Sequence, residues 1–473
     1  MFKKFYLSKK EVTNTVAAMA LLFALTSVIC YFVYLFGDDL TAWQWVRFLG
    51  VNLLLVAVFG IYLYCADIEI LHSAKKLYAI CLIMVFGLAV YVIIDKWVSP
   101  YAVPYALIPL TCGLIFSRKS GFISSLIIVM SMFFGQAFSE IVTTSYIPLF
   151  VGVCSSILSS YMLSNQNKRI NYIGVAVVLA VLTCLSNLML TLAVDEEASL
   201  LFVVVYSLLS GLVSVALFML VVPVLDSIFN FVTDFRLAEL TATDAPLMKR
   251  MFEEAPGTFN HCLTVANYTE ACASAIGANT YLARAAAYYH DIGKLKNPQY
   301  YSENQTDGHN PHDEITPELS TSLIKKHVSN GLLIAKEYRL PDMFGVFIKE
   351  HHGTMPIQFF YSKAQKYTDG TLDDTGFRYD GPTPSNKISA ILMICDASEA
   401  ALRALSVDDR MKAEQIVGNI INDRLKYHQF DNCDITMKEL NIIKETIVTV
   451  YVGISHKRIV YPNQKKNDES KAE

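Results

Sequence analysis

Histidine and aspartate residues form the strongest chemical pattern of this sequence, and they gather in its C-terminal half. Nine of the ten histidines of the 473-residue chain follow residue 240. A single histidine in an apolar helix is more often a packed side chain than a metal ligand, but here several have to be explained together. The candidate ligands are His261, His290, Asp291, His327, His351, His352 and Asp396.

The surroundings of the two aspartates favour a metal site. Asp291 ends an alanine-rich segment, and Asp396 lies inside the apolar stretch 391–397. Because burying an unpaired carboxylate is costly, we expect a metal ion or another cation beside them. Imidazole and carboxylate ligands together suit iron, manganese or zinc. The ten cysteines include no CxxC pair, so neither a thiolate metal site nor a disulfide framework is indicated.

Seven ligands are enough for two metal ions. One metal would be held by His261, His290, Asp291 and Asp396, and the second by His327, His351 and His352. Two metals a few ångströms apart can hold a bridging hydroxide, lower its pKa and clamp a phosphodiester for in-line attack. The chemistry that this set of residues could support is therefore phosphodiester hydrolysis.

Helices must position these ligands, because apolar residues beyond about residue 244 recur at helical spacing and strand-type alternation is scarce. The predicted helices span 262–276, 280–292, 317–328, 329–339, 342–351, 385–405, 408–426 and 436–452. Asp244 before Ala245-Pro246 is a good N-cap, so we expect this domain to span 244–462. We expect residues 360–383 to form a long loop and residues 463–473 a disordered tail.

The N-terminal part of the chain, residues 1–229, predicts a membrane domain. Charged residues make up only 17% of the chain, against roughly 25% in soluble globular proteins. Apolar segments fall at about 14–36, 46–65, 77–94, 101–116, 121–139, 144–163, 171–193 and 199–225. Since a helix needs about 20 residues to cross the hydrocarbon core, these segments predict about eight spans. No ionisable residue lies inside the spans proper, which argues against an ion-coupled transporter.

Lysine and arginine residues in the short loops predict the orientation of these spans, because they favour the cytoplasmic side. Threading eight helices puts ten basic residues on one side: Lys3, Lys4, Lys9, Lys10, Lys75, Lys76, Arg118, Lys119, Lys168 and Arg169. Only Arg47 and Lys96 fall on the opposite side. We therefore expect both termini and the C-terminal domain to be cytoplasmic.

A coupling helix is predicted at 230–243, between the last span and the C-terminal domain. Phe229, Val232, Leu237 and Leu240 recur at three to five residues and continue the helical pattern of the span. A rotation or shift of such a helix would allow the membrane domain to regulate the C-terminal domain.

The motifs around the ligands resemble those of the HD phosphohydrolase superfamily. His261, His290-Asp291 and Asp396 are similar to its H…HD…D signature, and residues 290–294 match its HDIGK form. The sequence is more similar still to the seven-transmembrane HD receptor family, the PgpH-type cyclic di-AMP phosphodiesterases. The resemblance covers residues 237–462 and includes the hallmarks Ala255-Pro256-Gly257-Thr258, Tyr289–Lys294, Glu303-Asn304-Gln305, Asn310–Asp313, His351–Thr354 and His456–Pro462.

The resemblance implies an all-α chain, with a polytopic helical membrane domain followed by an all-α HD-domain phosphohydrolase. It implies that iron or manganese forms the two-metal site and that Asp291 bridges the two ions. It also implies that Lys294 faces a substrate phosphate, although a lysine that complements a helix dipole is the alternative for this residue. The implied activity is metal-dependent hydrolysis of cyclic di-AMP to linear pApA, at the cytoplasmic face of a bacterial cell membrane.

Two alternative functions stay open: a non-hydrolytic nucleotide-sensing membrane receptor, and an HD phosphohydrolase that acts on another nucleotide. All seven ligands are present, which argues against a degenerate receptor. The segment after His352 lacks the Gly-Tyr-Pro signature of HD-GYP enzymes, which argues against cyclic di-GMP.

Family members commonly carry a large extracellular domain between the first two spans, where this chain has only residues 37–45. The expected partners are the cyclic dinucleotide, the lipid bilayer and a second copy of the chain in a homo-oligomer. No nucleic acid polymer is expected, because the formal net charge is −4.

Overall fold

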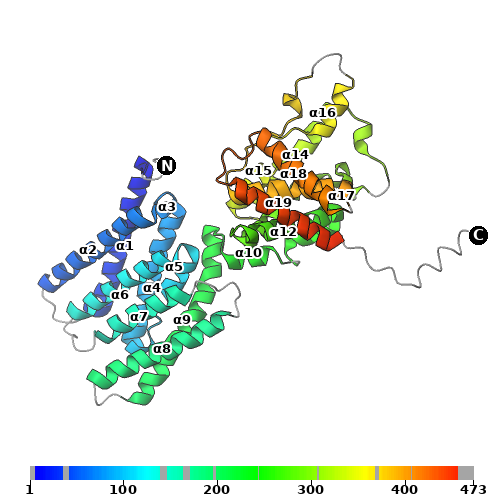
Figure 1. The fold of residues 1–473 in the computed structure, drawn as a ribbon. Helices are drawn as coiled ribbons and strands as arrows, with labels where there is room; N and C mark the ends of the chain where they lie inside the picture. Colours follow the sequence, from blue (N-terminus) through cyan, green and yellow to red (C-terminus); the bar gives the residue numbers. More distant parts are fainter. Residues whose placement is uncertain are drawn as a thin grey trace, which may run out of the picture. The chain divides into compact units, whose positions relative to one another are not determined.

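Helices account for the regular structure of both halves of the chain. The structure is a computed structural model and describes residues 6–35, 42–138, 146–162, 171–194, 199–242, 244–305, 308–367, 372–405, 407 and 409–455. Within these residues the extended backbone pairs only in an isolated bridge between Pro356 and Arg378. The predicted all-α fold is confirmed, and the chain divides into the units Met1–Arg236 and Leu237–Glu473 (Figure 1).

Six helices of the first unit are long and apolar enough to cross a membrane. They are α1 (Lys9–Cys30), α2 (Ala42–Ala66), α4 (Ala74–Trp97), α6 (Arg118–Phe138), α8 (Asn171–Val194) and α9 (Leu200–Phe229). Two shorter apolar helices, α5 (Leu107–Ile115) and α7 (Tyr146–Met162), occupy the other two predicted segments. Each of the eight predicted segments thus contains a helix within the described residues, but only six of these helices have full spanning length.

The predicted span at 101–116 is interrupted by proline. Its first part forms the 3₁₀ turn η3 (Pro100–Ala102), and Val103 is extended, with φ −60° and ψ 124°. The next residue is Pro104, and proline disfavours helical backbone in the residue before it. Helix α5 therefore begins only at Leu107, and its nine residues are too few to cross the hydrocarbon core.

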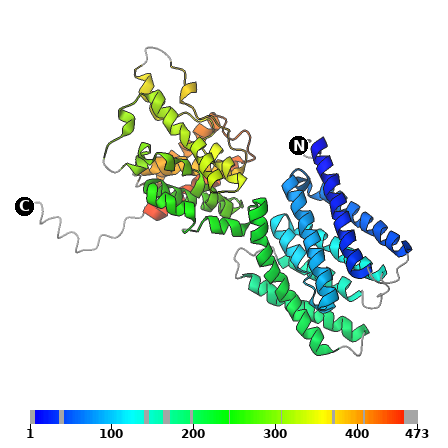
Figure 2. The same ribbon diagram turned by 180° about the vertical axis from the view of Figure 1, so that it is seen from behind.

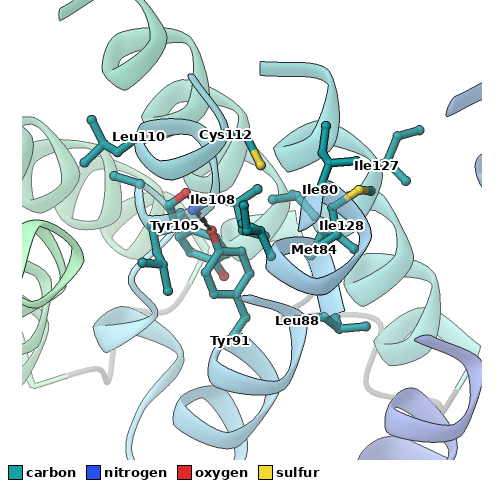
Figure 3. Packing of buried hydrophobic residues seen from close by; sticks show 14 of the residues in the cluster. Ile80, Met84, Leu88, Tyr91, Tyr105, Ile108, Leu110, Cys112, Ile127 and Ile128 are labelled. Carbon is teal, nitrogen blue, oxygen red and sulfur yellow. Dashed lines mark hydrogen bonds between the residues drawn. The ribbon is translucent and has the colours of Figure 1, made fainter. Parts of the chain in front are cut away.

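Helix α5 packs closely against α4 and α6. Figure 3 shows Tyr91 of α4 beside Tyr105 and Ile108, and the Tyr91 hydroxyl donates a hydrogen bond to Tyr105 O at 2.8 Å. The two helices approach so closely that a Cβ at Gly87 would lie 2.3 Å from Ile108 Cγ1. A larger residue at position 87 would therefore separate α4 from α5.

The predicted coupling helix is present only in part, because the helical backbone stops after Phe229. Asn230 adopts a left-handed conformation, with φ 55° and ψ 47°, that ends α9. A separate short helix, α10 (Asp234–Leu240), follows. The prediction of a continuous helix from the last span is wrong, since local side-chain spacing did not reveal this helix end.

The second unit consists of nine helices within the described residues. They are α11 (Pro246–Glu254), α12 (Pro256–Ala275), α13 (Thr280–Tyr289), α14 (Pro317–Glu337), α15 (Asp342–Glu350), α16 (Gln358–Gln365), α17 (Lys387–Ala404), α18 (Arg410–Lys426) and α19 (Met437–Ser455). Short 3₁₀ turns fill the connection from α13 to α14, beginning with η5 (Ile292–Lys296). Helix α12 packs against α13, α17 and α19 and forms the centre of this unit (Figures 1 and 2).

Two predictions for this unit need correction. The segments 317–328 and 329–339 form the single helix α14, which passes through Ser329 and Asn330 without a break. The predicted long loop 360–383 contains most of α16 and the 3₁₀ turn η9 (Thr375–Phe377), because Phe360, Ala364 and Phe377 pack together in a small apolar cluster. The predicted tail 463–473 and the motif His456–Pro462 lie outside the described residues.

Candidate metal centre

The seven predicted ligands meet at the centre of the second unit, although they come from five parts of the chain. They form two groups in which the ligand atoms lie within 4.8 Å of one another: His261, His290, Asp291 and Asp396, and Asp291, His327, His351 and His352. Asp291 belongs to both groups. The structure therefore brings together every residue of the predicted set, in the two predicted subsets.

Helix ends place four of these residues. His290 caps the C-terminus of α13, Asp291 follows it, and His351 caps the C-terminus of α15 with His352 next to it. His261 and His327 lie within α12 and α14, and Asp396 lies within α17. Ligands at helix ends are held by rigid elements while their side chains can still converge.

Gly293 allows the turn after Asp291 to lie directly against α14. A Cβ at this position would be 1.8 Å from the carbonyl oxygen of His327. No side chain fits there without separating Asp291 from His327, which explains the physical need for glycine in the His290–Lys294 motif.

Hydrogen bonds orient four of the imidazole rings in the same way. The Nδ1 atoms of three rings donate to the backbone carbonyl three residues earlier: His290 to Ala287 at 2.7 Å, His327 to Ile324 at 2.7 Å, and His351 to Ile348 at 2.9 Å. The Nδ1 atom of His261 donates to the carboxylate of Glu399. With Nδ1 as the donor, a neutral ring keeps a lone pair on Nε2 for a metal.

The two carboxylate oxygens of Asp291 face different groups. Oδ2 lies 3.3 Å from His290 Nε2 and 3.7 Å from His261 Nε2. Oδ1 lies 3.6 Å from His327 Nε2 and 3.7 Å from His351 Nε2. This arrangement gives each group of imidazoles one oxygen of the same carboxylate.

Asp396 completes the first group from helix α17. Its Oδ1 lies 3.0 Å from His261 Nε2 and 3.6 Å from His290 Nε2. Its Oδ2 lies 3.6 Å from His352 Nδ1, so this carboxylate also reaches the second group.

Two buried atoms at the middle of the site have no hydrogen-bond partner among the described residues: His290 Nε2 and Asp291 Oδ1. Leaving such atoms without a partner costs free energy, and divalent transition metals accept both imidazole nitrogen and carboxylate oxygen. The donor set and these two unpartnered atoms therefore fit a metal site.

The protonation states of the second group also suit metal binding. Burial lowers the pKa of His351 to about 3, and it lowers the pKa values of His327 and His352 as well. For Asp291, burial alone would raise the pKa, but the charges of Lys294 and His290 hold it well below its usual range. Neutral imidazoles and an ionised carboxylate are the forms that bind metals.

In the first group, His261 is protonated at neutral pH when no metal ion is bound. Burial alone would lower the pKa of His261, but hydrogen bonds with Asp396 and Glu399 raise it to about 10. A metal at this position would have to displace that proton, so proton release is expected to accompany binding.

Lys294 has two carboxylate partners. Its Nζ lies 2.7 Å from Asp291 Oδ2 and 2.7 Å from Glu303 Oε1, and it also lies over the ring of Tyr301. The side chain is only 13% exposed. The predicted contact with a substrate phosphate stays a prediction, since the structure contains no ligand; the observed contacts are with the two carboxylates.

Sequence reasoning missed three residues that support the centre. Glu399 lies one turn after Asp396 on α17, and its other oxygen pairs with Arg403 at 3.0 Å. Glu303, known from the sequence only as part of a motif, pairs with Lys294. The ring of Tyr379 stacks on His352 with a centroid distance of 4.2 Å. The spacing of Asp396 and Glu399 could have revealed the first, because residues three apart share a helix face.

Two further histidines of this unit, His309 and His312, lie outside the two groups. His309 is exposed and pairs with Glu314 at 2.9 Å. His312 is buried and contacts Tyr300 O through Nε2 at 2.9 Å. Both contacts are typical of structural residues.

Comparisons with known proteins agree with this architecture. Residues 42–233 match the family model of the 7TM receptor with intracellular HD hydrolase, and residues 258–401 match the HD domain. The cyclic-di-AMP phosphodiesterase PgpH of Listeria monocytogenes is 36% identical over 365 residues, which are 76% of this chain and 50% of that protein. PgpH of Bacillus subtilis is 34% identical over 371 residues, or 77% of this chain and 52% of that protein. The chain thus spans about half the length of these relatives.

Solved structures include a relative of the second unit. The crystal structure of the L. monocytogenes PgpH HD domain in complex with cyclic-di-AMP is 41% identical, covers 45% of this chain and all of that chain, and gives a TM-score of 0.44. The same domain in a second crystal structure is 42% identical over the same coverage, with a TM-score of 0.43.

Proposed function

The chain belongs to the family of seven-transmembrane receptors with an intracellular HD hydrolase domain, and from this membership we propose that it is a membrane-bound, metal-dependent phosphodiesterase. Its proposed substrate is cyclic di-AMP, and its proposed product is linear pApA. The observation that carries the proposal is the pair of ligand groups that share Asp291. Identity to two enzymes named for this substrate supports the choice of nucleotide.

Two divalent metals, iron or manganese, are the proposed cofactors. His261, His290, Asp291 and Asp396 would hold one, and His327, His351, His352 and the second oxygen of Asp291 would hold the other. When bound, such a pair supplies a bridging hydroxide as nucleophile and neutralises charge on the phosphodiester.

The residues of the chain keep this centre in a fixed geometry. Four imidazoles are held through Nδ1, and Lys294 holds one oxygen of Asp291. Burial of the ligands limits access of water to the site, which strengthens electrostatic interactions with a bound phosphodiester. We therefore assign Asp291 and Lys294 to the catalytic centre.

We further propose that the first unit anchors the enzyme in a bacterial cell membrane, with both termini and the HD domain in the cytoplasm. The distribution of basic residues in the short loops supports this orientation. Several of these residues, including Lys168 and Arg169, lie outside the described part of the chain.

The direct test is hydrolysis of cyclic di-AMP by the purified full chain in detergent micelles with Mn²⁺, with pApA measured by liquid chromatography. Asp291→Asn is the matched variant, because it keeps the shape of the side chain but removes the charge shared by the two groups. We expect pApA from the unaltered chain and none above background from the variant. Binding of cyclic di-AMP without any hydrolysis would instead favour the receptor alternative, and turnover of other nucleotides alone would overturn the assigned substrate.

A further inference from the structure

Arg424, in the last turn of α18, is a partly buried arginine whose Nε atom has no hydrogen-bond partner among the described residues. Its Nε–H is inaccessible to solvent and donates to no acceptor, and the side chain forms no ion pair or hydrogen bond with any described residue. Other partly buried arginines of this unit are paired: Arg250 with Glu254, Arg284 with Glu270 and Arg378 with Asp374. Arg424 is therefore an exception within its own domain.

A buried donor without an acceptor is energetically unfavourable. The guanidinium stays charged at all physiological pH values, even though burial lowers the pKa of Arg424. The Nε–H of Arg424 is withdrawn from water and has no acceptor among the described residues, which costs free energy. An anion that is not part of the protein would supply the missing acceptor.

The helix end that carries Arg424 is joined by hydrogen bonds to the segment that follows the candidate ligand His352. The backbone N–H of Gln429 donates to Arg424 O at 3.0 Å and closes the turn after α18. The Gln429 side chain accepts from Thr354 N at 2.9 Å and donates to Thr354 Oγ1 at 2.8 Å. Thr354 is two residues after the candidate ligand His352. The negative charges of Asp396 and Asp423 also act on Arg424 and raise its pKa, against the effect of burial.

Lys294 and Arg424 differ in whether their positive charge already contacts carboxylates of the protein. The ammonium of Lys294 contacts two carboxylates at 2.7 Å, so a phosphate would have to compete with both. Arg424 has no such competitor among the described residues. Its planar guanidinium can also contact two phosphate oxygens at once, which an ammonium cannot do in the same geometry.

We propose that Arg424 binds a phosphate group of the substrate at the metal centre. The inference rests on the proposed function for the identity of the substrate, but the ligand chemistry it requires is only a phosphate oxygen. Arg424 is thereby a substrate-binding residue that adds to the seven candidate ligands and Lys294.

The experiment compares the full chain with Arg424→Met and Arg424→Lys, all loaded with Mn²⁺ in detergent micelles. Arg410→Met is the control, because Arg410 is an exposed arginine in the first turn of the same helix. Affinity for inorganic phosphate is measured by isothermal titration calorimetry, and KM for cyclic di-AMP by product formation. Manganese content and the melting temperature of the ligand-free protein are measured in parallel.

We expect Arg424→Met to weaken phosphate binding and to raise KM by about tenfold or more, since hydrogen bonds to charged groups are of this magnitude. The phosphate affinity and KM of Arg424→Lys should lie between those of the unaltered chain and of Arg424→Met. Lysine keeps the positive charge but not the planar guanidinium. Manganese content should not change. The ligand-free melting temperature of Arg424→Met should be equal or higher, because a buried donor without an acceptor has been removed.

Phosphate affinity of Arg424→Met equal to that of Arg410→Met would overturn the inference. If Arg424→Met does not fold, Arg424→Lys takes its place in this comparison. A phosphate affinity of Arg424→Lys equal to that of Arg410→Met would then overturn the inference. A chain that does not hydrolyse cyclic di-AMP but loses phosphate affinity on Arg424→Met would refute the proposed function and leave the role of Arg424 in place.

Discussion

The Nε2 atoms of His327 and His351 lie 3.1 Å apart in the buried centre of the second unit. Both rings already donate through Nδ1 to backbone carbonyls, so two neutral rings present lone pairs to each other. These lone pairs repel unless a proton or a metal ion lies between them. Because burial lowers the pKa of both rings, and that of His351 to about 3, a metal is the favoured partner at neutral pH.

This relationship predicts the metal stoichiometry. The purified full chain should bind close to two transition-metal ions, and His327→Ala or His351→Ala should reduce the number to about one, because each removes a ligand of only one group. Hydrolysis of cyclic di-AMP should be lost in both variants, since the two ions act together. Elemental analysis by mass spectrometry measures the metal content.

His428→Ala is the control, because this exposed histidine pairs with Asp431 and belongs to neither group. It should retain two ions and full activity. Two ions retained in His327→Ala would contradict the assignment of the second group.

The ion pairs of Lys294 predict separate effects on stability and activity. Lys294→Met leaves Glu303 buried without its cation, and breaking a buried pair in this way costs about 3 kcal/mol or more. We expect that loss in the free energy of unfolding of the metal-loaded chain, measured by chemical denaturation, together with loss of hydrolysis.

The double variant Lys294→Met/Glu303→Gln separates the two roles. Removal of both charges should restore most of the stability, because no unpaired carboxylate is left at position 303. Hydrolysis should stay low, since Asp291 still lacks the ammonium that holds it. Activity recovered along with stability would show that Lys294 is only structural.

Glu399 is predicted to set the metal affinity of the first group through His261. Glu399→Gln keeps the shape of the side chain but replaces the carboxylate that accepts the Nδ1–H of His261. Loss of such a partner typically weakens metal binding by about 10- to 100-fold. Competition with a chelator of known affinity measures this change on the full chain.

Glu414→Gln is the matched control, because this glutamate pairs with Lys444 at the protein surface. Its metal affinity should equal that of the unaltered chain. An unchanged affinity in Glu399→Gln would mean that its hydrogen bond does not influence the metal site.

The loop charges predict the topology of the membrane unit. Reporter fusions after residues 10, 166, 197 and 473 should report inside, inside, outside and inside, because ten basic residues fall on one side of the eight-helix threading and two on the other. The two shorter helices α5 and α7 make the test informative. If neither α5 nor α7 crosses the membrane, both termini still lie on the same side. If only one of them crosses, the reporter after residue 166 should report outside instead of inside.

The sequence by itself determined the chemistry of the candidate centre. Histidine and aspartate are the residues that bind transition metals, and their presence in apolar helices was sufficient to identify all seven members of the two groups. Hydrophobic periodicity likewise predicted an all-helical chain and the positions of the apolar membrane segments, because burial of one face or of a whole helix leaves a repeated pattern in the residues.

Backbone conformation at single residues was decided by the three-dimensional structure. Asn230 ends α9 in a left-handed conformation, whereas Ser329 and Asn330 leave α14 unbroken. Polar residues of similar type thus end one helix and continue another, because packing with distant segments overrides weak local preferences.

The partners of the charged residues were also decided by tertiary structure alone. His261 meets Asp396 across 135 residues of sequence and Glu399 across 138. The type of a residue indicates what its side chain can bind, but only the fold decides which charged side chains already have a partner within the protein. For this reason Lys294, which the motif marked as the phosphate ligand, has two carboxylate partners, and Arg424, which no motif marked, has none among the described residues.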